Sequence, residues 1–172
     1  IFNIGQNHTA TISGMTITNG KPDPNFGTCG GGGIYNAGFL TLDGVVITNN
    51  ILVADTEPPI WCNYPRGGGI MSDGTGSLTI TNSTITNNNG FWSGGGINFS
   101  SSNGTLNMNN VKVGENSVIS YGGGVDFYNG NGAATLNKVV VSDNTVTDLS
   151  ATQGGGIHNG DVMTITNSTI QL

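Results

Sequence analysis

The chain is poor in charge, above all in basic residues. Of its 172 residues only 8% are charged, and the four Lys and Arg against ten Asp and Glu leave a net charge of −6. A typical soluble domain carries about 25% charged residues. Because four basic residues cannot neutralise a run of phosphates, the composition predicts no nucleic-acid partner.

Long apolar runs and helical patterns are also missing. No stretch approaches 18 consecutive apolar residues, so the sequence predicts no transmembrane helix. No apolar stripe recurs with a 3.6-residue period, and the 30 Gly residues disfavour helices. The chain begins at Ile1 without a signal-peptide pattern, so we expect a mature or excised segment.

One motif is repeated along the whole chain. Gly-Gly-Gly followed by Ile or Val occurs five times, and each time a short loop leads into an alternating apolar stretch. The five motifs end at Ile34, Ile70, Ile97, Val125 and Ile157. A sixth apolar stretch starts at Ala10, with Ile4 in the place of the motif's Ile. Self-similarity at periods of 20–50 residues is typical of solenoids.

Aligned copies place apolar residues in two columns. The first column is Ile12, Leu42, Ile80, Met108, Leu136 and Ile165. The second column is Ile17, Ile47, Ile85, Val113, Val141 and Ile170. Both columns advance by 30, 38, 28, 28 and 29 residues. Within each copy the apolar pattern has period 2, which predicts a strand, a tight turn and a second strand.

The turns and the stacking of copies predict the fold. Dipeptides such as Asp43-Gly44 favour a left-handed turn, whereas Asn137-Lys138 departs from this pattern. No copy can bury its own apolar face, but stacked copies turn each column into a continuous apolar rib. We therefore expect an all-β fold, a right-handed parallel β-helix of about six coils in one segment, 1–172. A flat sandwich with hairpin turns between copies is the competing interpretation.

Two further columns have structural explanations. The Gly-Gly-Gly motifs predict a corner at which backbones approach closely or adopt positive φ. A column of Asn predicts stacked side-chain amides that hydrogen-bond along the β-helix. This column is Asn50, Asn88, Asn116 and Asn144.

The repeated motif resembles a known group of proteins. Gly-Gly-Gly-Ile followed by an Asn- and Thr-rich strand ending in Ile-Thr-Asn-Asn, as at 47–50 and 85–88, resembles the repeats of polymorphic outer-membrane proteins and related bacterial surface proteins. Those repeats are similar in architecture to the pectin-lyase-like right-handed β-helices. The resemblance covers essentially the whole chain. It implies a secreted passenger or surface-displayed stalk, extracellular or at the cell surface, with an adhesive or structural role.

The insertions predict loops clustered on one side of the β-helix. All of them fall between the second strand of a copy and the next Gly-Gly-Gly motif. These loops hold Phe26 and a candidate ligand-binding set that we call the aromatic ridge: Trp61, Tyr64, Phe91, Trp92 and Tyr121. Exposed aromatic residues suit a glycan or a protein partner. The alternative is that the rings fold back and seal the side of the β-helix.

The two cysteines lie in consecutive loops. Cys29 and Cys62 each precede a Gly-Gly-Gly motif by a few residues, so stacked coils would bring them within reach of a disulfide. Such a bond would close a loop of about 34 residues and stabilise the fold by about 3–4 kcal/mol in the chain-entropy model. It would also indicate an oxidising compartment. Two buried free thiols are the alternative, and no Cys spacing predicts a metal site.

Two pairs of polar residues are candidates for chemistry. Asp126 and His158 occupy the position after the motif in successive copies, within reach of proton transfer. Glu115 and Asp143 form a second pair that could share a proton or a cation. Exposed polar residues on any solenoid meet their neighbours by construction. The sequence therefore predicts no catalytic site, no cofactor and no metal.

The outward positions of the first strand carry mostly threonine. They are Thr11, Thr41, Thr79, Asn107, Thr135 and Thr164. A flat, regular Thr face resembles the surface of ice-binding proteins. The plainer explanation is the high strand propensity of Thr.

These features predict a non-catalytic extracellular structural or adhesive β-helix, either a surface stalk, a passenger or a filament subunit. The alternatives are a polysaccharide-active β-helix enzyme fragment and an ice-binding protein. The uncapped end coils predict a head-to-tail homopolymer or flanking coils of a longer chain. The other expected partner is a glycan or a host or cell-surface protein.

Overall fold

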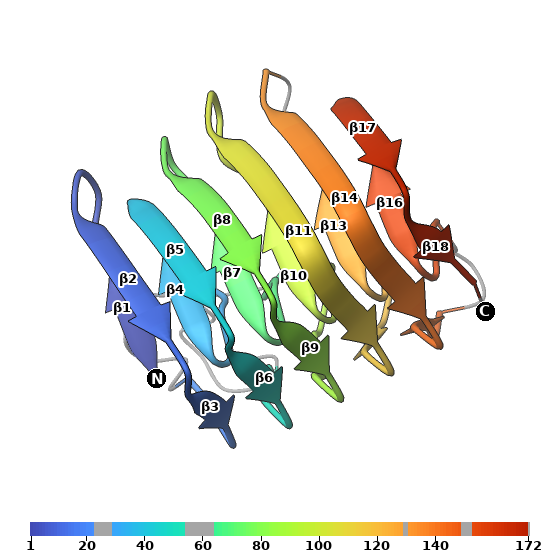
Figure 1. Cartoon of the computed structure of the whole chain (residues 1–172). Helices are drawn as coiled ribbons and strands as arrows, with labels where there is room; N and C mark the ends of the chain where they lie inside the picture. Colours follow the sequence, from blue (N-terminus) through green and yellow to red (C-terminus); the bar gives the residue numbers. More distant parts are fainter. Residues whose placement is uncertain (23–28, 54–63, 129–130, 149–152, 172) are drawn as a thin grey trace.

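The protein winds into a parallel β-helix. The computed structural model describes residues 1–171 except 23–28, 54–63, 129–130 and 149–152. Every regular element in these residues is a strand, and every strand pairing is parallel. Six rungs lie side by side in chain order (Figure 1). The predicted β-helix is confirmed, and the antiparallel sandwich is wrong.

One sheet starts, in every rung but the first, from the Ile or Val that ends the glycine motif. In the first rung Phe2 lies opposite Ile34 and Ile4 lies opposite Asn36, so the predicted place of Ile4 is wrong. Its strands are β1 (Phe2–Ile4), β4 (Ile34–Asn36), β7 (Ile70–Ser72), β10 (Ile97–Phe99), β13 (Val125–Phe127) and β16 (Ile157–Asn159), stacked in that order. The sequence did not predict this sheet, because three residues are too few to display an alternating pattern.

A second sheet of ten strands carries the two apolar columns. Before the bend of each rung lie β2 (Thr9–Ser13), β5 (Phe39–Asp43), β8 (Ser77–Thr81), β11 (Thr105–Gly114), β14 (Ala133–Ser142) and β17 (Val162–Thr166). After it lie β3 (Thr16–Thr18), β6 (Val46–Thr48), β9 (Thr84–Thr86) and β18 (Thr169–Ile170). β11 and β14 continue through the bend as single strands, where two strands were predicted. A two-stranded sheet pairs β12 (Ser117–Val118) with β15 (Thr145–Val146).

Each rung bends at a residue with positive φ. Gly44 has a φ of 61° and Asn110 a φ of 55°, as the turn dipeptides predicted. Lys138 adopts the same conformation with a φ of 54°, although its residue type disfavours it. Because β14 pairs with β11 on one side and with β17 and β18 on the other, stacking sets this conformation.

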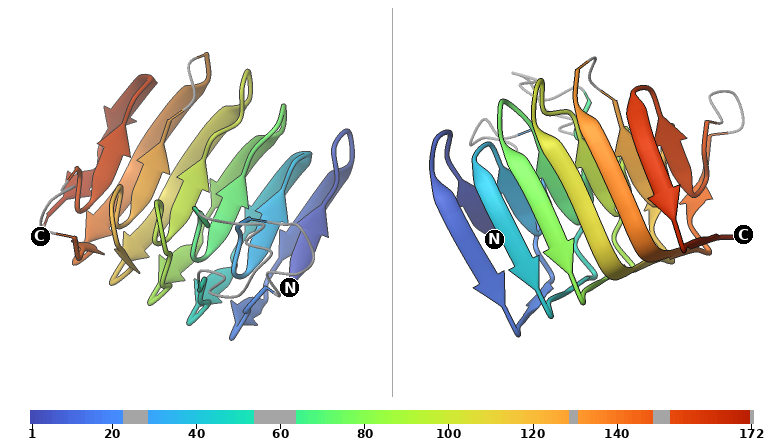
Figure 2. Two further views of the ribbon diagram at one scale, coloured as in Figure 1. Left: turned by 180° about the vertical axis from the view of Figure 1, so that it is seen from behind. Right: turned by 45° about the horizontal axis from the view of Figure 1, so that its top comes forward.

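The apolar columns form the core between the two sheets. Their registers match the alignment of the copies, as in Leu42 opposite Ile80 and Ile47 opposite Ile85. The inner rungs bury these side chains completely. In the last rung the column residues Ile165 and Ile170 are 43% and 46% exposed, because no rung covers them. Figure 2 shows the two sheets facing each other across the rungs.

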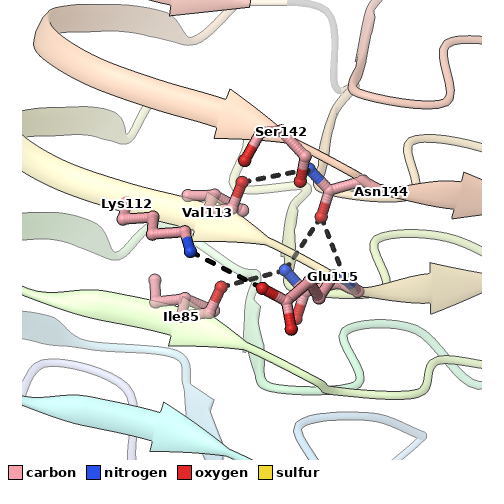
Figure 3. A network of polar contacts seen from close by, with 7 residues as sticks. Ile85, Lys112, Val113, Glu115, Ser142 and Asn144 are labelled. Carbon is pink, nitrogen blue, oxygen red and sulfur yellow. Dashed lines mark hydrogen bonds and ion pairs between the residues drawn. The ribbon is translucent and has the colours of Figure 1, made fainter. Parts of the chain in front are cut away.

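The Asn column forms a buried ladder of side-chain amides. Figure 3 shows one of its members, Asn144, whose Nδ2 also donates to the backbone oxygen of Val113. Asn50 Nδ2 donates to Asn88 Oδ1 at 2.9 Å, and the same bond links Asn88 to Asn116 and Asn116 to Asn144 at 3.0 Å. Asn116 also donates to the backbone oxygen of Ile85. The prediction of stacked amides is confirmed. Since the described residues include no helix, none of them forms a membrane-spanning one.

Candidate active or binding pocket

The glycine corners bring two columns of side chains to one surface. The residues just before successive corners pair with one another: Gly30, Arg66, Ser93, Tyr121 and Gln153. The residues that follow the motif's Ile or Val also stack in register: Tyr35, Met71, Asn98, Asp126 and His158. The corner needs glycine because its first residue has positive φ, for example 64° at Gly94, where a Cβ would collide with the backbone oxygen of Ile97.

The two columns meet in a pocket of about 240 Å³, which we call the corner pocket. Its lining residues are Arg66, Trp92, Ser93, Tyr121, Asp126, Tyr128 and His158. The lining combines three aromatic rings with a cation, a carboxylate and an imidazole. Such a mixture is typical of small-molecule sites, in which a few polar groups orient a ligand against apolar walls.

Asp126 and His158 are hydrogen-bonded inside this pocket. Asp126 Oδ1 lies 2.7 Å from His158 Nδ1, and the two side chains are 6% and 20% exposed. Asn98 Nδ2 donates to Asp126 Oδ2 at 2.8 Å and to Ser93 Oγ at 2.9 Å. Asn98 is buried, and its Oδ1 accepts no hydrogen bond from the described residues. Asp126 and His158, which occupy equivalent positions in neighbouring copies, are therefore in direct contact.

A series of aromatic rings leads from the exposed Tyr64 to the imidazole of His158. Tyr64 meets Trp92 edge to face with centroids 4.7 Å apart, and Trp92 meets Tyr121 at 6.0 Å. The Tyr121 and Tyr128 rings lie 5.3 Å and 6.3 Å from the His158 ring. The imidazole therefore lies near two tyrosine rings at the end of this series of aromatic residues.

The fold and the pocket agree with a comparison against known families. The family described as a right-handed β-helix region matches residues 2–170. The chain belongs to the right-handed β-helix family. This confirms the predicted handedness and the pectin-lyase-like architecture. Searches of curated proteins and of solved structures find no significant match.

The aromatic ridge is only partly gathered on this right-handed β-helix. Trp92 and Tyr121 line the corner pocket, and Tyr64 lies beside Trp92 with 56% of its surface exposed. Phe91 is half-buried and does not line the pocket. Trp61 lies outside the described residues, as does Phe26. Ligand binding by the ridge stays a prediction.

Sequence reasoning missed three residues of the corner pocket, Arg66, Ser93 and Tyr128. Arg66 immediately precedes a Gly-Gly-Gly motif, like Ser93 and Tyr121, so the position before the motif was the available signal. Tyr128 follows Asp126 by two residues, but the equivalent positions of the other copies carry no aromatic residue that would have indicated it. Arg66 forms no ion pair with the described acidic residues.

The predicted disulfide falls partly outside the described residues. Cys29 is described and is not a free thiol. Cys62 lies in the segment 54–63, which the structure does not describe. The bond between the two cysteines therefore stays a prediction for this β-helix.

The polar residues Glu115, Asp143 and His8 do not line the corner pocket. Glu115 pairs with Lys112 at 3.6 Å rather than with Asp143, and both side chains of that ion pair are about half exposed (Figure 3). The described residues contain no cluster of three or more metal-ligating side chains. His8 is exposed and its Nδ1 contacts the backbone oxygen of Gln6 at 2.9 Å.

The Thr face exists as the alignment predicted. Its residues lie in register along the second sheet, as in Thr11 opposite Thr41 and Asn107 opposite Thr135. The neighbouring outward column contains an acid, Asp43, whose pKa is lowered by hydrogen bonds from Thr81 and Asn82. Ice binding by this face stays a prediction.

Tyr35 and Asp73 form a hydrogen-bonded titratable pair outside the corner pocket. The Tyr35 hydroxyl donates to Asp73 Oδ2 at 2.9 Å. Burial, together with the hydrogen bond and charge of Asp73, raises the pKa of Tyr35 to about 12. Burial also raises the pKa of the Asp73 carboxyl, and the hydrogen bond from Tyr35 partly offsets this increase.

Proposed function

We propose that the protein is an extracellular structural or adhesive β-helix that binds glycans at the corner pocket. The observation that carries this proposal is the lining, in which Trp92 and Tyr121 lie beside Arg66 and the Asp126–His158 pair. Aromatic faces pack against the apolar faces of sugar rings, while the polar groups bind hydroxyls. The ridge residue Tyr64 extends this surface beyond the pocket.

An extracellular location is supported by the chemistry of the chain. The predicted Cys29–Cys62 disulfide would persist only in an oxidising compartment. The resemblance to bacterial surface repeats supports the same location. Mass spectrometry of tryptic peptides from native material tests the disulfide directly, and two alkylatable thiols would contradict it.

Calorimetric titration with neutral and acidic oligosaccharides tests glycan binding. Trp92→Ala removes the indole from the pocket wall, so we expect at least a tenfold increase in Kd. Phe39→Ala is the matched control, because Phe39 is an exposed aromatic residue on the second sheet and does not line the pocket. Failure of the native protein to bind any of these sugars would contradict the proposal, as would an unchanged Kd for Trp92→Ala.

Polysaccharide-active catalysis is a second candidate function. The 2.7 Å contact between Asp126 and His158 favours it, because a hydrogen-bonded His and carboxylate in a pocket can transfer protons. Incubation with polysaccharides, followed by analysis of the released products, tests this candidate. Turnover that disappears in Asp126→Asn would establish catalysis, and its absence on all substrates would reject it.

The exposed last rung supports the predicted stacking partner. Ile165 and Ile170 continue columns that are fully buried in the inner rungs. A further rung over β17 and β18 would cover them, whether from flanking coils or from another copy of the chain. Sedimentation of the purified chain distinguishes these sources, because only stacking between copies depends on protein concentration.

A further inference from the structure

The hydrogen bonds around Asp126 determine which nitrogen of His158 is free. Asp126 Oδ2 accepts from Asn98, and Oδ1 contacts His158 Nδ1. Because a carboxylate can only accept, Nδ1 carries the imidazole proton. In the neutral imidazole, His158 Nε2 then keeps its lone pair, and it accepts no hydrogen bond from the described residues. An oriented imidazole nitrogen that is free in a pocket is suited to act as a general base.

The pocket does not have the paired carboxylates of ordinary glycoside hydrolysis. That reaction uses two carboxyl groups about 5–9.5 Å apart on either side of the scissile bond. Asp126 is the one carboxylate among the described lining residues, and both of its oxygens are already engaged. This arrangement suits chemistry in which a His–Asp pair activates water, such as the hydrolysis of an acyl ester.

The charge of the protein points to a neutral sugar. The chain has a net charge of −6, which repels polyanionic chains such as polyuronates. Within the pocket, Arg66 is balanced by Asp126, so the lining itself carries little net charge. The rings of Trp92, Tyr121 and Tyr128 offer apolar surface for a sugar ring and for a small acyl group.

We propose that the corner pocket hydrolyses O-acyl esters, of the acetyl class, on neutral sugars. This inference rests on the glycan binding proposed above for the same pocket. It assigns His158 as the general base, Asp126 as the carboxylate that orients it, and Arg66 as the cation beside the reacting carbonyl.

The reaction needs only water as a second reactant. His158 Nε2 takes a proton from water while the water oxygen bonds to the ester carbonyl carbon. Negative charge develops on the carbonyl oxygen, and Arg66, which has no ion-pair partner among the described residues, stabilises it. The bond from the carbonyl carbon to the sugar oxygen then breaks, and that oxygen takes the proton from His158. The products are a free acid and a sugar hydroxyl.

Acetylated xylo-oligosaccharides are the probe for the experiment, and released acetate is the readout. We expect the native chain to release acetate and His158→Gln to lower kcat by about 100-fold or more with little change in KM. His8→Gln is the matched control, because His8 is exposed and does not line the pocket. We expect this variant to retain the native rate.

Asp126→Asn provides a second variant that keeps the pocket folded. Asn98 Oδ1 accepts no hydrogen bond from the described residues, so a flip of the Asn98 amide lets it accept from the new side-chain amide and from Ser93. We expect native-like circular dichroism and a strongly reduced kcat, since an amide stabilises the imidazolium less than a carboxylate does.

Three results would overturn the inference. The first is no acetate release by a native chain that binds the same oligosaccharides, which leaves the glycan-binding proposal intact. The second is an unchanged rate in His158→Gln. The third is an ultraviolet-absorbing unsaturated product from polygalacturonate without any acetate release, which would assign the pocket to elimination. Absence of sugar binding altogether would instead contradict the proposed function.

Discussion

Asn88 and Asn116 are joined by two hydrogen bonds that cross from one rung to the next. Asn116 Oδ1 accepts from the backbone N–H of Asn88 and from Asn88 Nδ2, both at 3.0 Å. Each side chain is 1% exposed. Because one amide binds both the backbone and the side chain of its neighbour, the ladder fixes the vertical register of the rungs at this corner.

Removal of one amide from the ladder should destabilise the β-helix. Asn116→Ala leaves the backbone N–H of Asn88 without its buried acceptor. It also removes one of the two hydrogen bonds to Asn144 Oδ1, which keeps the bond from the backbone N–H of residue 116. We expect the free energy of unfolding to fall by about 2–4 kcal/mol, measured by urea denaturation. Asn107→Ala is the control, since Asn107 is exposed and its side chain bonds to Thr105 alone among the described residues. It should change stability by less than about 0.5 kcal/mol. Equal effects of the two substitutions would contradict the role of the ladder.

Two glycines of the same column should respond differently to alanine. A Cβ on Gly124 would lie 2.6 Å from the backbone oxygen of Gly156, which cannot move without shifting a rung. A Cβ on Gly156 would meet its nearest neighbour, Val141, at 3.4 Å, because no rung lies beyond it. We expect Gly124→Ala to lower the free energy of unfolding by about 1–3 kcal/mol or more, and Gly156→Ala to change it little. Thermal denaturation of both variants checks this difference.

Tyr35 should make stability fall at high pH. Its pKa is about 12 in the folded state, against an ordinary 10, mainly because of burial. Between these two pH values the unfolded chain loses the phenol proton while the folded chain keeps it, so stability decreases as pH rises through this window. Ultraviolet titration of phenolate should show one late-ionising tyrosine in the native protein. Tyr35→Phe should remove it, and a late phase that persists in this variant would contradict the assignment.

The predicted disulfide should contribute to stability under oxidising conditions. A bond between Cys29 and Cys62 would constrain the unfolded chain by about 3–4 kcal/mol. We expect a reductant to lower the Tm of the native chain and to leave a Cys29→Ser/Cys62→Ser double variant unchanged. An identical Tm with and without reductant would show that the two thiols are not joined.

Asn98 should act as a positioning residue in the corner pocket. Asn98→Ala removes the hydrogen bond to Asp126 Oδ2, which frees the carboxylate to rotate away from His158. If the pocket hydrolyses acyl esters, we expect kcat to fall about tenfold with little change in KM. A purely structural role would lower Tm and leave kcat of the folded fraction unchanged.

The repeating parts of the fold could be predicted because each appears in several copies. Ile47 and Ile85 occupy equivalent places in their copies, and the structure places them opposite each other. The left-handed Lys138 could not be predicted from its residue type, because its conformation is set by the rungs on either side.

The corner pocket was predictable only in part. Asp126 and His158 fall in one alignment column, so their contact follows from stacking alone. Arg66 belongs to a different column, and its place in the same pocket as Asp126 depends on how the three glycines turn the chain. That turn brings together positions on either side of the motif, and no periodic pattern connects them.

Equivalent residues of successive rungs lie opposite each other even where the number of residues between them differs. Leu42 and Ile80 are 38 residues apart, whereas Ile80 and Met108 are 28 residues apart, yet both pairs sit on adjacent rungs in register. The additional residues of the longer copies fall between the second strand and the next glycine motif, and the strands stay in register. Such a scaffold can acquire longer or chemically different segments on that flank while its interior stays unchanged, so recognition can diversify independently of folding.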